Sequence, residues 1–123
     1  PAEVRATLAA LRELYPTHHI TAVFQPHLYS RTKLLLGEFA ESFHDASYAM
    51  ITDIFASREA KDESIHAKDL VAAITSAGDK AAYIEDFRAV HALLEGEELQ
   101  TDVLLTLGAG SIGTLADALM VQG

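Results

Sequence analysis

Cysteine is absent from this sequence of 123 residues. Without a thiol the chain can form no disulfide, can use no cysteine nucleophile and can bind no zinc through cysteine. The lack of disulfides also fits a reducing compartment, so we expect a cytoplasmic protein.

Long apolar runs are missing as well. No stretch approaches the roughly 20 apolar residues of a membrane-spanning helix, and the N-terminus lacks the basic segment and apolar core of a secretory signal. We therefore expect no membrane partner. Hydrophobic residues still make up 50% of the chain and charged residues 22%, which permits a core and argues against intrinsic disorder. The length is that of one domain, so residues 1–123 are expected to fold as a single unit.

Basic residues are scarce. Nine Lys and Arg face 18 Asp and Glu, for a formal net charge of -9. A polyanion such as DNA would meet net repulsion, and we expect no nucleic-acid partner. A small anion could still bind where the few basic side chains converge, so the position of each Arg is informative.

Hydrophobic periodicity predicts helices that alternate with strands. Short apolar segments rich in β-branched residues predict buried strands at 20–24, 48–55, 80–84 and 102–107. Apolar residues spaced three and four apart predict amphipathic helices, two of which end at Gly78 and Gly96. The apolar stripes of these helices are Val4, Leu8, Leu11 and Tyr15; Leu35, Phe39 and Phe43; Leu70, Val71 and Ile74; Phe87, Val90, His91 and Leu94; and Ile112, Leu115, Ala116 and Leu119.

This alternation implies right-handed crossovers and an α/β fold, doubly wound, with a mostly parallel sheet flanked by helices in a Rossmann-like arrangement. Ligands of such folds bind beyond the carboxyl ends of the strands. A site is therefore expected in the loops that follow Phe24, Phe55, Ile84 and Leu107. The polar stretch at 56–64 has the length of a functional loop.

The segment 24–32, of sequence FQPHLYSRT, follows the first strand and opens a helix. We expect Ser30 to cap this helix, with His27 and Tyr29 in the loop and Arg31 in the first turn. Free N–H groups and the helix dipole favour an anion there, and a guanidinium can hold a carboxylate or phosphate through two hydrogen bonds. The alternative is structural: Arg31 pairs with a nearby Glu, and His27 only caps the loop.

Segment 24–32 is similar to a signature of the Mur ligase family, in particular of the members that add alanine. Two further segments resemble the same family at suitable distances: 52–59, of sequence TDIFASRE, and 107–113, of sequence LGAGSIG. The resemblance extends over nearly the whole chain, and its most specific part is the first segment.

The resemblance implies an ADP-forming ligase in which ATP phosphorylates the lactyl carboxylate of UDP-N-acetylmuramate and the amine of L-alanine attacks the acyl phosphate. In this family an N-terminal domain holds the UDP-sugar, and a central domain carries the phosphate loop and the Mg ligands. The chain would be the C-terminal domain, which closes over the site and helps to bind the amino acid and the nucleotide. Its partners would be the remaining ligase domains and the three substrates, with ATP and Mg held mainly by the central domain.

The same resemblance places His27 and Arg31 in the amino-acid and acyl-phosphate region. Both would orient substrate and stabilise charge, and no residue is assigned a catalytic role in proton transfer or nucleophilic attack. Many family members have Arg where this chain has Leu28, so one cationic contact is missing or comes from elsewhere, with Arg58 as the candidate. Tyr29 would pack beside the site, although such an aromatic is equally consistent with a structural role.

Two remaining patterns, the terminal glycines and the histidines, give weaker evidence for a functional site. Gly108, Gly110 and Gly113 form Gly-x-Gly-x-x-Gly, but the dinucleotide fingerprint belongs to a first βαβ unit with an acidic residue about 20 positions later. Here we interpret the glycines as a tight turn. The six histidines lack metal-ligand spacing, so no metal site is predicted. Asp53 and Glu59 are only weak site candidates.

Three alternatives remain open. The chain could belong to another Mur-type amide ligase that attaches a preformed peptide, such as a murein peptide ligase. It could be a Rossmann-type nucleotide-binding module that uses the terminal glycines, or a non-catalytic interaction domain. The chain begins at Pro1 rather than Met and has no Gly-x-x-x-x-Gly-Lys-Ser/Thr phosphate loop. We therefore expect a fragment that folds but does not catalyse by itself.

Overall fold

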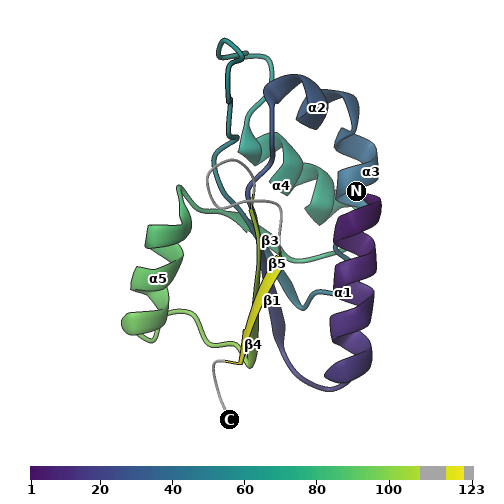
Figure 1. Ribbon diagram of the computed structural model, residues 1–123, viewed down its shortest axis with the longest axis vertical. Coiled ribbons are helices and arrows are strands. Elements are labelled where there is room, and N and C mark those ends of the chain that lie inside the picture. The colour runs from purple at the N-terminus through teal and green to yellow at the C-terminus, as the bar shows by residue number, and fades with distance from the viewer. Residues whose placement is uncertain (109–115, 121–123) are drawn as a thin grey trace.

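The computed structural model describes residues 1–108 and the strand at 116–120, and it forms an α/β sheet structure (Figure 1). The strands are β1 Ile20–Phe24, β2 Tyr48–Ile51, β3 Ala81–Tyr83, β4 Val103–Leu107 and β5 Ala116–Met120. They lie in the order β3-β2-β1-β4-β5. All neighbouring pairs are parallel except β4 and β5, which are antiparallel. The predicted mostly parallel sheet is therefore confirmed.

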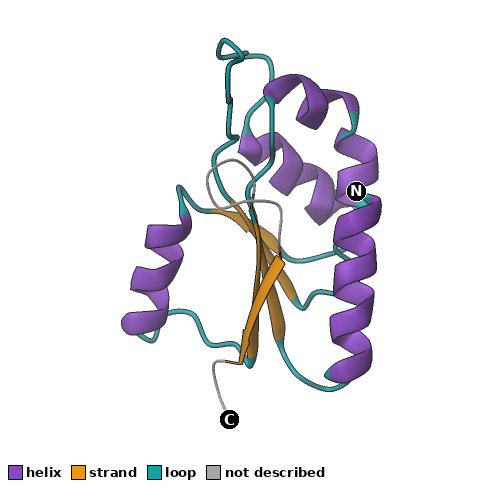
Figure 2. Ribbon diagram, viewed as in Figure 1, coloured by secondary structure: helices purple, strands orange, loops and turns teal. Residues whose placement is uncertain are grey.

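Helices cover both faces of this sheet, as a doubly wound fold requires (Figure 2). The helices are α1 Ala2–Leu14, α2 Tyr29–Leu34, α3 Leu36–Ala40, α4 Ala67–Ser76 and α5 Phe87–Glu95. The first four lie on one face, and α5 lies on the other (Figure 1). None of these described helices has the length and apolar character needed to span a membrane.

Alternate residues of β1 pack on opposite faces of the sheet, which explains why this strand is apolar except for Thr21. On β1, Ile20 and Phe24 join the larger core beneath α1 and α4, whereas Val23 joins the smaller core beneath α5. Every residue of β1 is buried. A central parallel strand has no solvent-facing side, so it shows no polar alternation.

The apolar stripes predicted for the helices that became α1 and α4, both of which pack on the larger core, are confirmed. Val4, Leu8 and Leu11 of α1 are buried, and Tyr15 packs against them. In α4, Leu70 and Ile74 are fully buried. This helix ends before Gly78, whose φ of 101° lies in the left-handed region that a glycine adopts without strain.

The second predicted helix is divided in two. It changes direction at Leu35, whose backbone (φ -105°, ψ 18°) leaves the helical region between α2 and α3. Gly37, a weak helix former, follows the break. The division still lets Phe39 and Phe43 enter the core, where both contact the Phe24 ring at 5.3 and 5.7 Å between centroids.

Three predicted strands are shorter than expected. The strand at 48–55 ends at Ile51, and those at 80–84 and 102–107 begin and end within one residue of their predicted limits. The early end of β2 has a clear cause: Pro26, which follows β1, has no N–H to continue the ladder. Further along, only an isolated bridge joins His27 and Phe55.

The predicted final helix is wrong where the structure describes it. Ala116 and Leu119 lie in β5, which pairs antiparallel with β4 so that Val103 faces Met120 and Leu107 faces Ala116. Without β5, the outer edge of β4 would leave its N–H and C=O groups unpaired. Satisfying that edge outweighs the helix propensity of the Ala- and Leu-rich segment. Ile112 and Leu115 of the predicted stripe lie outside the described residues.

His44 joins the end of α3 to the turn before β3 through two carboxylates. Its ring lies between Glu41 (Nε2 to Oε2, 2.6 Å) and Asp79 (Nδ1 to Oδ2, 2.7 Å). The hydrogen bond with Glu41 is the main cause that raises the pKa of His44 above its ordinary 6.5, and the Asp79 charge adds to it.

Because the folded pKa is raised, the stabilisation from His44 should be complete below about pH 6 and lost as the pH rises through the folded pKa. We expect His44→Gln to lower the free energy of unfolding by about 0.5 kcal/mol at pH 5.5, since half-exposed pairs contribute little. At pH 8 the variant and the parent should unfold at the same urea concentration. A difference that is larger at pH 8 than at pH 5.5 would contradict this sign.

Candidate functional site

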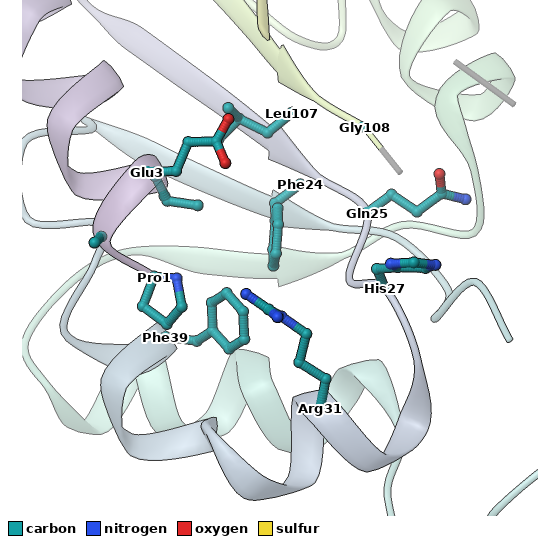
Figure 3. A pocket seen from close by; sticks show the side chains of 11 residues that line it. Pro1, Glu3, Phe24, Gln25, His27, Arg31, Phe39, Leu107 and Gly108 are labelled. Atoms are coloured by element: carbon teal, nitrogen blue, oxygen red, sulfur yellow. The ribbon is translucent and has the colours of Figure 1, made fainter. Parts of the chain in front are cut away.

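A cavity lies at the carboxyl ends of β1 and β4 (Figure 3). These neighbouring strands are the place where the sheet changes its winding direction: the chain leaves β1 toward β2 and returns, after α5, to β4 on the other side. Loops diverge at such a point and leave a crevice, which is where ligands of doubly wound folds bind. The cavity has a volume of about 470 Å³.

Apolar and polar groups line different parts of this cavity. Phe24 and Phe39 form part of its wall, together with Leu107 at the end of β4. The polar lining comes from the loop after β1, from Arg31 of α2 and from the start of α1, where Glu3 contributes a carboxylate (Figure 3). The lining residues are Pro1, Ala2, Glu3, Val4, Phe24, Gln25, His27, Arg31, Phe39, Leu107 and Gly108.

His27 is held at the cavity edge by the segment that follows β2. Its ring stacks on Phe55 with 5.8 Å between centroids. Two backbone hydrogen bonds surround the contact, from Leu28 N–H to the Phe55 carbonyl (2.8 Å) and from Phe55 N–H to the Pro26 carbonyl (2.9 Å). The His27 side chain is exposed, so it is fixed in place but accessible to a ligand.

Arg31 extends from α2 toward the cavity, where its guanidinium points at the wall that contains Phe39 (Figure 3). Within residues 1–108 no carboxylate lies at ion-pair distance from it. The structural alternative, in which Arg31 forms an ion pair with a nearby Glu, is therefore not seen among these residues. As far as residues 1–108 are concerned, its donors are available to bind an anion.

The start of α2 is already occupied by a carboxylate of the chain itself. Glu59 Oε1 accepts the Ser30 N–H at 3.2 Å, and Oε2 accepts a short hydrogen bond from the Ser30 hydroxyl. This second bond is the main cause that lowers the pKa of Glu59. The prediction that Ser30 caps the helix is wrong: the capping position is Leu28, and Ser30 lies within the first turn. A bound anion would therefore meet Arg31 rather than the helix start.

Of the four predicted site residues, the structure brings His27 and Arg31 together on the cavity. Tyr29 instead lines a separate hollow of about 240 Å³ with Ser30, Glu59, Ala60 and Asp62. Arg58 is exposed in the turn before Glu59 and lines neither hollow. The additional cationic contact expected from Arg58 is not seen at the cavity.

Sequence reasoning missed the start of α1, Gln25 and Phe39 as parts of the site. Gln25 lies in the predicted loop, but its amide gave no chemical signal. Phe39 was assigned to the core, and its stripe indeed predicts that role. The start of α1 reaches the cavity only through the tertiary fold, and no local pattern could have revealed this.

A second group of polar side chains lies beyond β2 and β3, at the same edge of the sheet. The Tyr83 hydroxyl donates to Asp53 Oδ1 at 2.5 Å, and this bond is the main cause that raises the pKa of Tyr83 to about 12. His66 Nε2 lies 3.7 Å from the same oxygen, and Lys68 Nζ lies 5.3 Å from the centre of the Tyr83 ring. These contacts connect the loop after β2 with the start of α4. Asp53, a weak candidate from the sequence, thus has internal partners.

The residues that the structure describes contain no group of three or more His, Cys, Asp or Glu that could hold a metal ion. His44, His66 and His91 each lie beside carboxylates of the chain. Of the Gly-x-Gly-x-x-Gly pattern only Gly108 falls in the described part, where it lines the cavity. Gly110 and Gly113 lie outside it.

Comparison with known proteins gives a consistent result. Residues 1–110 match the family model described as "Mur ligase, glutamate ligase domain". The chain is 47% identical to the UDP-N-acetylmuramate–L-alanine ligase of Caldanaerobacter subterraneus subsp. tengcongensis, over 91% of the chain and 24% of that enzyme. It is 41% identical to the ligase of the same name from Acetivibrio thermocellus, over 91% of the chain and 24% of that enzyme. With the Alkaliphilus metalliredigens ligase it shares 40% identity over 99% of the chain and 26% of that enzyme. The chain thus spans about a quarter of the length of these relatives.

Proposed function

Because this chain belongs to the Mur ligase family, with residues 1–110 in its glutamate ligase domain, we propose that it is the C-terminal domain of an ATP-dependent ligase that joins L-alanine to UDP-N-acetylmuramate. The observation that supports this most is the cavity at the switch point of the sheet. His27 and Arg31, both from the segment most similar to the alanine-adding ligases, line this cavity.

The proposed reaction runs in two steps that involve the lactyl carboxylate of UDP-N-acetylmuramate. A carboxylate oxygen attacks the γ-phosphorus of ATP, so that ADP leaves and an acyl phosphate forms. The amine of L-alanine then attacks the acyl carbon, inorganic phosphate leaves, and the nitrogen loses a proton. Phosphorylation supplies the leaving group that a bare carboxylate lacks.

In this reaction the domain would bind and orient rather than transfer protons. The Arg31 guanidinium could grip the alanine carboxylate or the acyl phosphate through two parallel hydrogen bonds. His27, stacked on Phe55, would present a ring nitrogen to the same ligand. Holding the alanine amine in line with the acyl phosphate turns their bimolecular reaction into a reaction within one bound complex.

ATP and Mg would be held mainly by a central domain of the same ligase. The described residues gather no group of potential metal ligands, and the sequence has no phosphate loop. This chain would contribute the cavity at β1 and β4 to the same site, facing the central domain.

The test is an assay of a ligase that carries this chain as its C-terminal domain. We expect phosphate release that requires ATP, L-alanine and UDP-N-acetylmuramate together, with loss of the signal when any one is omitted. A parallel reaction with a preformed peptide in place of L-alanine tests the alternative Mur-type ligase. Turnover with the peptide alone, or none with either substrate by a folded protein, would overturn the proposal. Tight binding of NAD in calorimetry would favour the nucleotide-binding module instead.

A further inference from the structure

Glu59 joins the loop after β2 to the helix that carries Arg31. Its two carboxylate oxygens take up the N–H and the hydroxyl of Ser30, the residue immediately before Arg31. Helix α2 has only six residues. A helix this short has little stability of its own, so its first turn depends on contacts with the rest of the fold.

The residue that opens α2 is held in an unusual conformation. Leu28 has φ 69° and ψ 135°, a left-handed geometry that a branched side chain rarely adopts. Such a backbone persists only where its surroundings fix it. Here the Leu28 N–H donates to the Phe55 carbonyl (2.8 Å), and the Leu28 carbonyl accepts the N–H (3.1 Å) and hydroxyl (2.8 Å) of Thr32.

The segment between β2 and α4 therefore holds the start of α2 at two points. Phe55 fixes Leu28 and stacks on His27, whereas Glu59 fixes Ser30. His27 and Arg31, which line the cavity from the loop after β1 and from α2, each lie next to a fixed residue. The two attachments thus hold the turn from which the Arg31 side chain extends.

We propose that Glu59 is a positioning residue that acts through Arg31: it fixes the first turn of α2 so that the guanidinium is directed into the cavity. This inference rests on the proposed function, because Arg31 is taken to bind the substrate there. Glu59 itself does not line the cavity. The residue thus differs from Arg31 and His27, which would contact the ligand.

The first test is amide hydrogen exchange in the ligase that contains this chain. We expect Glu59→Gln to speed exchange at residues 30–34 by about tenfold, because the amide cannot accept both Ser30 donors as a charged carboxylate does. The matched control is Glu63→Gln, which removes an exposed carboxylate of the same loop that makes no side-chain hydrogen bond or ion pair with the described residues. Unchanged exchange in Glu59→Gln, or an equal change in Glu63→Gln, overturns the proposal.

The second test is a double-mutant cycle on turnover. We expect Glu59→Gln to lower kcat/KM about tenfold in the parent and to have no further effect in an Arg31→Ala background. Both changes would weaken the same contact, the one between the Arg31 guanidinium and the substrate. Losses that multiply in the double variant would show that Glu59 does not act through Arg31. Thermal unfolding of each variant separates this coupling from a general loss of stability.

The outcomes also distinguish the two proposals. An inactive parent overturns the proposed function and the positioning role together. An active parent in which Glu59→Gln leaves exchange unchanged, or does not couple to Arg31, overturns the positioning role alone.

Discussion

Arg31→Ala should lower kcat/KM for L-alanine by about 100-fold in the ligase that contains this chain, since removal of one preorganised donor to a developing charge commonly costs this much. Stability should hardly change. The Arg31 side chain is exposed and has no ion-pair partner within residues 1–108, and substitutions of that kind alter the free energy of unfolding by less than about 0.5 kcal/mol. Steady-state kinetics and thermal unfolding of the same preparation measure both quantities.

Two further variants sharpen this prediction. Arg31→Lys keeps the charge but loses the planar pair of donors, so it should recover only part of the activity. Arg88→Ala removes an exposed Arg from α5, on the opposite face of the sheet, and should leave kinetics unchanged. If Arg31→Ala instead lowered activity and stability in proportion, Arg31 would be a structural residue.

The parts of the fold that follow from local patterns could be predicted. Each buried strand is a short apolar run, and each long helix has a stripe with helical spacing, as Leu8 and Leu70 illustrate in α1 and α4. Their alternation then leaves few topologies, because crossovers between parallel strands are almost always right-handed. The position of the cavity followed from the same reasoning, since a doubly wound sheet opens beyond its strand ends.

What could not be predicted depends on contacts between distant segments. The sequence around Ala116 fits a helix, and only the free edge of β4 makes it a strand. Glu59 reads as a solvated carboxylate until the fold places it on Ser30, 29 residues earlier. For the site, proximity within one segment brought His27 and Arg31 together, whereas the contribution of α1 requires the complete tertiary structure.

Arg12 illustrates the same limit with a larger effect on stability. On the helical wheel it is a charged residue away from the apolar stripe. In the structure its guanidinium donates four hydrogen bonds, which join the end of α1 to the segments before β1 and β2. The acceptors are the carbonyls of Asp45 (3.1 Å), Tyr15 (3.2 Å) and His18 (2.7 Å) and the hydroxyl of Ser47 (3.2 Å).

We expect Arg12→Met to lower the free energy of unfolding by about 2–3 kcal/mol, because hydrogen bonds from a charged donor are worth about 1.5–3 kcal/mol and the methionine keeps only the apolar stem. For a domain of this size the melting temperature should fall by about 10 °C. The melting temperature of Arg12→Lys should lie between those of the parent and Arg12→Met, since one ammonium cannot reach acceptors on three segments. Arg5→Met removes an exposed Arg from the same helix and should change the melting temperature by no more than about 2 °C. Equal losses in the Arg12 and Arg5 variants, measured by circular dichroism, would mean that helix charge rather than the contacts of Arg12 sets the stability.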